Sequence, residues 1–286
     1  MKALLFHTLW GWQGSLEAAS QYAQQSGFDG LEANLEHPCI KGWRANEVQT
    51  LLNQQNHPLI VEITTGGGYT PSIELSPEHH LAELETKLEQ ACELAPLRIN
   101  LITGSDCWPV AEQHRFLERC LQLLSHTPVP VSLETHRSRS LFNPWAIEDI
   151  LKAHPSLRLT ADVSHWCVVA ERLMSPELHP IQAMASHVDH IHARVGHEQG
   201  AGVPQPFTAS WQEALEAHAQ CWSLFAQQRL QSGQQLTLTP EFGPDGYMPV
   251  HPESGEPLAD VTTINQLMAD WLRKGSWLSC ASASMR

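Results

Sequence analysis

Basic residues are scarce in this 286-residue sequence, and long apolar runs are absent. Only 17 residues are Lys or Arg, against 31 Asp or Glu, so the formal net charge is −14. A field of this sign repels phosphate backbones and anionic lipid headgroups, so neither nucleic acid nor a membrane is an expected partner. No apolar run reaches the roughly 18 residues of a membrane-spanning helix, and the amino-terminal residues show no small-residue cleavage pattern. We therefore expect a soluble, cytoplasmic protein.

The sequence also lacks paired cysteines and a glycine-rich nucleotide loop. Its seven cysteines are an odd number without any C-x-x-C pair, which argues against a disulfide framework and against a cysteine zinc site. After the first predicted strand the sequence reads T-L-W-G-W-Q-G, which is not the glycine pattern of a dinucleotide-binding turn. An open doubly wound sheet is therefore the less favoured of two α/β architectures.

Eight short strand-like runs alternate with helix-like stretches along the chain. The predicted strands are 3–8, 28–33, 58–64, 97–103, 129–135, 157–163, 188–194 and 236–242. This alternation predicts parallel strands joined by helical crossovers. Eight such units at this length fit a single (β/α)8 TIM barrel. Because no repeat or long linker marks a second domain, we predict one domain over 1–286, with a frayed tail at 279–286.

Helix starts can be placed between these strands, because side-chain oxygens satisfy the free N–H groups of a first turn. Ser76, Asn143 and Ser175 each precede a proline, which is typical of a capped helix start. Ser210 and Glu213 have the spacing of a capping box before a long amphipathic stretch. These caps predict where four of the helices begin.

Four potential metal ligands fall at the carboxyl ends of the last four predicted strands, namely Glu134, Asp162, His192 and Glu241. Each alone would be interpreted as a turn or cap residue, but closure of a barrel brings equivalent strand ends round one rim. Converging carboxylates without nearby lysines repel one another, and a divalent cation reverses that repulsion. Three carboxylates and one imidazole favour Mn²⁺, and Mg²⁺, Co²⁺ or Zn²⁺ are also compatible. We predict one divalent metal ion, whose open positions accept a hydroxyl and a carbonyl of a small carbohydrate-like substrate.

The segments L-E-T-H, D-V-S-H, H-I-H-A-R-V-G and T-P-E-F-G resemble motifs of the xylose isomerase-like TIM barrel superfamily, particularly its sugar phosphate isomerase/epimerase branch. The resemblance covers roughly strands four to eight and implies that Glu134, Asp162, His192 and Glu241 bind the metal. In epimerase members the two glutamates also exchange a proton with a substrate carbon from opposite faces. The resemblance therefore implies that Glu134 and Glu241 are the catalytic acid and base. It also implies that His165 contacts a substrate oxygen, with a neutral supporting residue as the alternative.

Four more residues are predicted to line the same rim and to bind substrate: His7, Glu62, His136 and Arg194. Arg194 suits a hydroxyl, carboxylate or phosphate of the substrate, or an acidic side chain of the rim. His190 and His192 share side-chain parity, so alternation alone does not choose between them. The resemblance and the nearer strand end favour His192, and His190 is expected one layer deeper as a hydrogen-bonded core residue. The two long loops 195–208 and 243–259 follow the last two strands, and the first is expected to cover the site.

The predicted function is a divalent-metal-dependent sugar or sugar phosphate isomerase or epimerase of carbohydrate metabolism, which moves a proton next to a metal-bound carbonyl. A dehydratase or other lyase of an inosose-like or acidic polyol would use the same proton abstraction, so the sequence separates these two reactions poorly. An endonuclease would need a basic groove for DNA, which the net charge opposes. A non-catalytic barrel that retains the metal is the alternative from a different class. Because members of the superfamily often form dimers or tetramers, a homo-oligomer is also expected.

Overall fold

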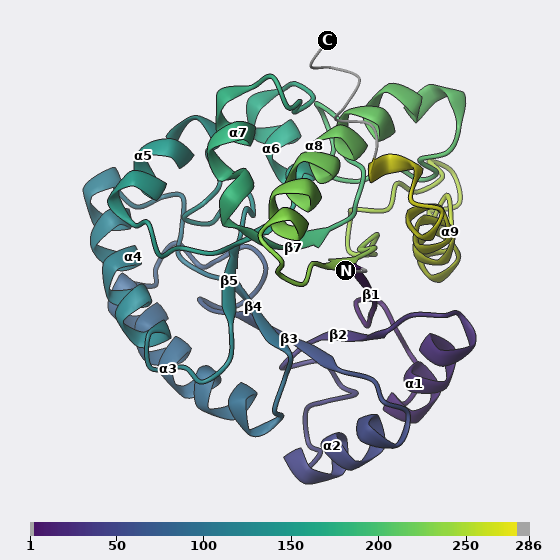
Figure 1. Ribbon diagram of the computed structural model, residues 1–286, viewed down its shortest axis with the longest axis horizontal. Coiled ribbons are helices and arrows are strands. Elements are labelled where there is room, and N and C mark those ends of the chain that lie inside the picture. Colours follow the sequence, from purple (N-terminus) through teal and green to yellow (C-terminus); the bar gives the residue numbers. More distant parts are fainter. Residues whose placement is uncertain (1–2, 279–286) are drawn as a thin grey trace.

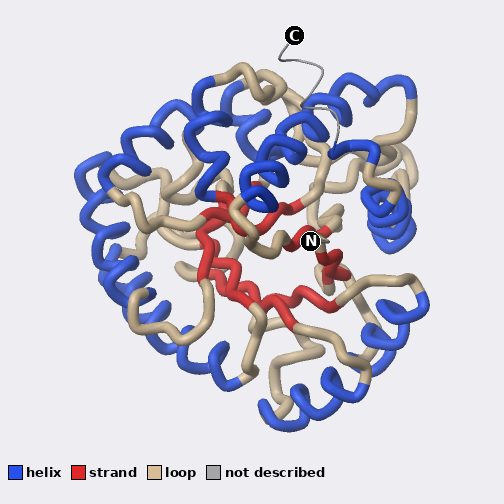
Figure 2. Tube along the Cα trace, viewed as in Figure 1, coloured by secondary structure: helices blue, strands red, loops and turns tan. Residues whose placement is uncertain are grey.

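The computed structural model describes residues 3–278, in which eight parallel strands close into a barrel in chain order. Figures 1 and 2 show these strands at the centre of the molecule, enclosed by helices. The strands are β1 (Leu4–Thr8), β2 (Gly30–Asn34), β3 (Leu59–Thr64), β4 (Arg98–Ile102), β5 (Val131–Glu134), β6 (Leu159–Ala161), β7 (Val188–His192) and β8 (Thr237–Thr239). Strand β1 pairs with β8 and thereby closes the sheet. The predicted (β/α)8 barrel is confirmed, and each predicted strand overlaps an observed one.

Helices cover the outside of the barrel and connect successive strands (Figure 1). They are α1 (Leu16–Gln25), α2 (Ala45–Gln54), α3 (Pro77–Glu93), α4 (Val110–Leu124), α5 (Ile147–Ala153), α6 (Val163–Ala170), α7 (His179–Met184), α8 (Gln212–Gln231) and α9 (Val261–Arg273). Within residues 3–278 none of the helices is both long enough and apolar enough to cross a membrane. The expectation of a frayed tail at 279–286 lies outside the described residues.

Two of the predicted helix caps are wrong. Ser175 does not begin a helix, because α7 starts at His179 with Pro180 in its first turn. Ser210 lies inside a short 3-10 turn, Ala209–Trp211, which leads directly into α8 without a side-chain cap. In both places a serine that could cap a helix lies close to an observed helix start without capping it.

The other two caps, at Ser76 and Asn143, are confirmed. The Ser76 hydroxyl accepts a 3.3 Å hydrogen bond from the backbone N–H of His79 at the start of α3. The Asn143 side chain accepts from the backbone N–H of Trp145 at 3.0 Å. Each side chain satisfies an N–H group that the helix itself leaves free.

Replacement of Ser76 by Ala is expected to lower the free energy of unfolding by about 1 kcal/mol, because α3 loses its cap. Ser210→Ala is the matched control, since Ser210 is exposed and caps no helix; its expected change is within about 0.5 kcal/mol. Chemical denaturation of both variants measures the difference. Equal losses in the two variants would contradict the assignment of the cap.

The two faces of the barrel strands differ in polarity. Apolar side chains such as Leu31, Val61 and Leu101 belong to the hydrophobic core outside the barrel, and alternate residues face the interior. Glu32 of β2 hydrogen-bonds His190 of β7, and since these strands are not neighbours the contact crosses that interior. Buried polar side chains on the inward-facing positions include Glu32, Glu62, Asn100, Glu134, Thr160, His190, His192 and Thr239. Burying polar groups is costly unless they are hydrogen-bonded, so this interior depends on contacts between side chains.

The loops 195–208 and 243–259 meet beside the carboxyl end of the barrel. The backbone N–H of Gly196 donates to Nε2 of His218 on α8 at 3.3 Å, which fixes the start of the first loop. A Cβ atom at Gly202 would lie 2.7 Å from the carbonyl oxygen of Tyr247 in the second loop. Only glycine at position 202 therefore allows the first loop to pack this closely against the second.

Candidate metal centre

Four donor side chains converge at the carboxyl end of the barrel. Glu134 ends β5, Asp162 follows β6, His192 ends β7 and Glu241 follows β8. These residues offer one donor atom each, all within 4.8 Å of one another, and all four are buried. Nδ1 of His192 is 2.8 Å from Oε2 of Glu241 and 3.4 Å from Oε2 of Glu134. The structure thus brings together the four residues predicted as metal ligands, and metal binding itself remains a prediction.

The segment T-A-D-V-S-H places two side chains of the site on one strand-to-helix junction. Strand β6 ends at Ala161, and Asp162 caps α6 because its Oδ1 accepts from the backbone N–H of Ser164 at 3.0 Å. The first turn of α6 then presents His165. Its Nε2 lies 3.6 Å from Oδ2 of Asp162 and 3.8 Å from Oε1 of Glu134. Helix capping and site assembly therefore use the same aspartate.

Glu241 is positioned by a clamp beyond the end of β8. Pro240 follows the strand and has no N–H to continue the ladder. The Asn265 side chain on α9 then bonds both the N–H and the carbonyl of Phe242, each at 2.8 Å. This pair of bonds replaces strand pairing and fixes the backbone next to Glu241.

The site concentrates more negative charge than its own cations neutralise. Burial raises the pKa of Glu241 to about 7, although His192 and Arg194 act in the opposite direction. Burial, together with the charges of Glu241 and Glu134, raises the pKa of Glu62 to about 8. Burial also opposes ionisation of Glu134, but His192 outweighs it and lowers that pKa to about 2. A divalent cation among these carboxylates would favour their charged forms.

The donor set fits such a cation. Nδ1 of His192 is close to two carboxylates but is aligned for a hydrogen bond with neither. Its Nε2 atom bonds Oε1 of Glu32 at 3.1 Å instead. The ring therefore anchors one nitrogen and presents the other to the cluster. Three carboxylates and one imidazole are donors that suit a hard or borderline divalent ion.

Arg194 lies among these donors, and only 2% of its surface is exposed. Its Nη2 bonds Asp162 and, at 2.9 Å, Nε2 of His165. Nε donates to the Ser164 hydroxyl at 3.1 Å, and Nη1 donates to the backbone carbonyl of Glu241 at 3.3 Å. Arg194 thus holds the side chain of Asp162 and the backbone of Glu241, and its contact with substrate remains a prediction.

Two aromatic rings pack against the Arg194 guanidinium. The ring centre of Tyr247 is 4.6 Å from its Cζ atom, and that of Trp10 is 5.5 Å away. A Cβ atom at Gly243 would lie 2.1 Å from the Trp10 ring, so glycine is needed to admit the indole. The Trp10 N–H donates to Asp245 at 3.0 Å. Trp10 in the loop after β1 and Tyr247 in the loop after β8 thereby form an aromatic wall beside the four predicted metal ligands.

His165 and His136 lie side by side at the cluster, with ring centres 3.9 Å apart. Burial lowers the pKa of His165 well below its ordinary value, and the nearby His136 and Arg194 lower it further. The His165 ring is therefore neutral. Since Nε2 accepts from Arg194, the proton is on Nδ1, which has no hydrogen-bond partner among residues 3–278. His136 donates from Nδ1 to the carbonyl of Arg137 at 2.5 Å, and burial lowers its pKa to about 4. His165 therefore keeps one unused donor.

Glu62 of β3 lies near the same cluster. Its charge interacts with those of Glu134 and Glu241, and its Oε1 accepts from Nδ2 of Asn34 at 2.6 Å. The structure places Glu62 where the sequence predicts it, on the inner rim, and its role in substrate binding remains a prediction.

The prediction that His7 lines this rim is wrong. Its ring packs 4.8 Å from Tyr22 of α1, 5.3 Å from Phe28 and 5.4 Å from Trp12, measured between ring centres. Burial lowers its pKa to about 4, so the ring is neutral at pH 7. His7 is therefore an aromatic packing residue between β1 and α1, on the outer face of the strand.

Three residues of the site escape the sequence prediction: Glu32, Asn100 and Tyr247. Asn100 donates from Nδ2 to Oε2 of Glu134 at 2.7 Å, and Glu32 bonds His192. Each stands between two apolar residues of its strand, in L-E-A and I-N-L, and that interruption is a signal that could have found them. Tyr247 lies in a long loop, which has no helix or strand periodicity from which the direction of its side chain could be predicted.

Comparison with known proteins confirms the fold that the resemblance implies. No family model matches the sequence, and a comparison with curated protein sequences gives no match. Among solved structures, an L-ribulose 3-epimerase is similar with a TM-score of 0.67 and 12% identity, over 100% of this chain and 97% of that chain. The probable 3-DHS dehydratase AsbF of Bacillus anthracis is similar with a TM-score of 0.62 and 14% identity, over 95% and 99%.

A third similar structure is the IOLI protein with a binding zinc atom. Its TM-score is 0.61 at 12% identity, over 97% of this chain and 98% of that chain. These likenesses extend over whole chains, and at such identities they show a common fold. The chain thus has the TIM barrel architecture found in sugar epimerases, in a dehydratase and in a zinc-binding protein.

Proposed function

We propose that this protein is a divalent-metal-dependent isomerase or epimerase of a small sugar or sugar phosphate. The observation on which the proposal rests is the convergence of Glu134, Asp162, His192 and Glu241 at the carboxyl end of the barrel, where barrel enzymes build their active sites. Mn²⁺ is the proposed ion because three of the four donors are carboxylates. A bound divalent ion would polarise a carbonyl and a neighbouring hydroxyl of the substrate.

Glu134 and Glu241 are the proposed acid and base. They come from β5 and from the segment after β8, which are not neighbouring strands, and both carboxylates lie within 3.4 Å of Nδ1 of His192. Carboxylates that reach a substrate carbon from two sides can remove a proton on one face and return it on the other. Before a metal ion binds, the two carboxyls already differ in proton affinity, since the pKa of Glu134 is lowered and that of Glu241 is raised.

His165 and the aromatic wall are the proposed substrate contacts. The unused Nδ1 donor of His165 supports a hydrogen bond to a substrate oxygen. Trp10 and Tyr247 are half-buried, and the ring surface that Arg194 does not cover would pack on the C–H surface of a sugar. His136, Glu62 and Arg194 are proposed to complete the pocket.

A lyase is the second candidate, and the fold likeness to a dehydratase supports it. The same glutamate would remove the proton, and the second acid would protonate a departing hydroxyl instead of returning the proton to carbon. The difference between the two candidates lies in whether the substrate loses water.

The test is NMR detection of deuterium uptake from D₂O into a panel of ketoses, aldoses, their phosphates and inososes, with Mn²⁺-loaded protein. Uptake at a carbon without loss of water would support the isomerase or epimerase. Formation of an elimination product would select the lyase. Metal binding without exchange in any compound would count against both enzymes and favour a binding protein.

A further inference from the structure

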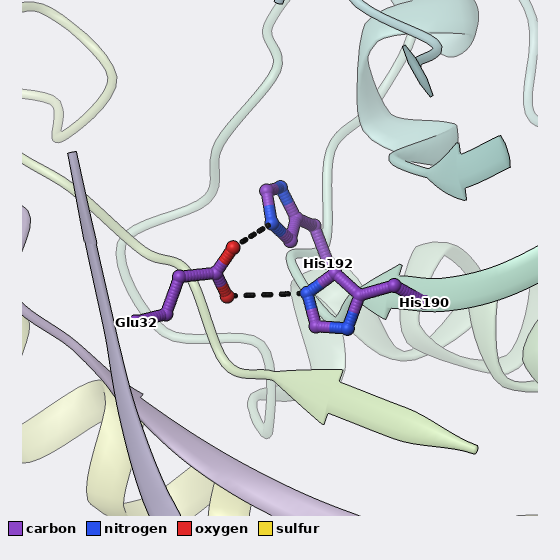
Figure 3. A group of neighbouring side chains, drawn as sticks. All are labelled: Glu32, His190 and His192. Atoms are coloured by element: carbon purple, nitrogen blue, oxygen red, sulfur yellow. Dashed lines mark hydrogen bonds and ion pairs between the residues drawn. The ribbon is translucent and has the colours of Figure 1, made fainter. Parts of the chain in front are cut away.

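Glu32 is a buried carboxylate that bridges the two histidines of β7 from across the barrel (Figure 3). Oε1 lies 3.1 Å from Nε2 of His192, and Oε2 lies 3.1 Å from Nε2 of His190. The hydroxyl of Thr239 on β8 also bonds Oε2. The carboxylate therefore receives three donors from two strands that are not paired with β2.

These contacts fix the direction of each hydrogen bond. An ionised carboxylate only accepts, so both histidines must carry a proton on Nε2 where they face Glu32. The Nδ1 atom of His190 lies 2.7 Å from the Thr237 hydroxyl, which can donate to it. The same Nδ1 atom also lies 3.1 Å from the carbonyl oxygen of Thr237. His190 occupies Oε2 of Glu32, and Oε1 is left for His192.

The consequence for His192 is that Nδ1 is the one ring nitrogen left to bind a metal ion. Once Nε2 is committed to Glu32, a neutral ring has only Nδ1 left as a ligand atom, and this atom faces Glu134 and Glu241. We infer that Glu32 is a positioning residue, which orients His192 and keeps its Nδ1 available to the divalent ion of the proposed centre. The inference rests on the proposed metal site and names a residue that does not itself belong to the four-residue cluster.

If Glu32 orients His192, its replacement should weaken metal binding and not only destabilise the barrel. Metal-bound histidines commonly donate their second N–H to a carboxylate, and loss of that partner typically weakens metal binding 10- to 100-fold. In Glu32→Gln the amide would present an acceptor to only one of the two histidines and an N–H group to the other. The ring of His192 would then lose its fixed tautomer or its orientation.

The experiment measures the affinity of the metal-free protein for Mn²⁺ and for Zn²⁺ by competition with a chromogenic chelator. Glu32→Gln is expected to weaken both affinities by about 10- to 100-fold. Glu32→Asp, which keeps the charge on a shorter side chain, is expected to fall between Gln and the natural residue. Thermal unfolding of each metal-free variant shows whether the fold persists.

Glu83→Gln is the matched control. Glu83 is also a hydrogen-bonded carboxylate, which accepts from the backbone N–H of Gly66 at 2.7 Å and pairs with Lys87, away from the cluster. Its replacement is expected to leave metal affinity unchanged even if stability falls. Metal affinity of Glu32→Gln equal to that of the natural protein would overturn the inference and leave the metal site standing. Absence of metal binding by the natural protein would overturn the metal site and the inference together.

Discussion

Replacement of Glu241 by Gln is expected to lower the rate of deuterium uptake into a substrate by about 10²- to 10⁴-fold, the usual contribution of a general acid or base. The side chain keeps its size, so the Asn265 clamp on the neighbouring backbone should persist. The amide can neither accept nor return a proton at carbon. A protein that only binds sugar would keep its affinity for the ligand in this variant, so the measurement pairs exchange rate with ligand affinity.

The control for this substitution is Glu253→Gln, which removes an exposed carboxylate from the loop 243–259 that follows Glu241. It is expected to leave both exchange rate and ligand affinity unchanged. Because Glu241 is also a proposed metal ligand, exchange is compared at saturating Mn²⁺. Full exchange activity of Glu241→Gln at saturating metal would remove Glu241 from the catalytic pair.

Replacement of Arg194 by Met is expected to lower the free energy of unfolding by about 3–5 kcal/mol when a chelator is present, the usual effect of breaking a buried ion pair. Arg194 bonds Asp162, and its Nη1 lies 3.6 Å from Oε2 of Glu241, with all three side chains buried. Met fills much of the volume but removes the guanidinium from both carboxylates. Urea denaturation measures the loss.

The loss should depend on pH in a defined direction. Burial already raises the pKa of Asp162 above its ordinary value, although Arg194 opposes the shift, so removal of Arg194 raises it further. A carboxyl whose pKa is higher in the folded than in the unfolded state binds its proton more tightly when folded. Stability of the variant therefore falls as pH rises through that pKa. The deficit should be larger near neutral pH than in mildly acidic solution.

Arg172→Met is the control, because Arg172 is exposed and its guanidinium lies 5.4 Å from the ring centre of Trp145. Its expected change is within about 0.5 kcal/mol at every pH. A deficit of Arg194→Met that is equally small, or that grows in acid, would show that Arg194 does not neutralise the buried carboxylates.

The sequence predicts the positions of the four ligand candidates well, because their location follows from topology alone. Parallel strands in a closed barrel end on one rim, so Glu134, Asp162, His192 and Glu241 could be placed together without knowledge of any side-chain contact. The resemblance and the greater distance from the strand end, not topology, predict His190 one layer deeper than His192, and its side chain bonds Glu32 and Thr237.

The failures have a common physical cause. Strand β1 is largely buried on both faces, so its sequence L-L-F-H-T does not reveal which face is the interior, and the prediction puts His7 on the wrong one. Contacts across the barrel, such as Glu32 with His192, join residues 160 positions apart that no local pattern connects. Tyr247 reaches Arg194 only through the path of a long loop.

The two faces of the barrel strands carry two sets of residues with different physical roles. Apolar side chains between strands and helices hold the chain in its topology, and cores of this kind tolerate exchange of one apolar residue for another. The inward-facing side chains of the same strands, by contrast, determine which chemistry the rim can perform. A library of variants confined to those inward positions would therefore sample new substrates, provided that each variant keeps the hydrogen bonds on which the polar interior depends. The same separation explains how chains that are only 12–14% identical to this one keep its fold along their whole length.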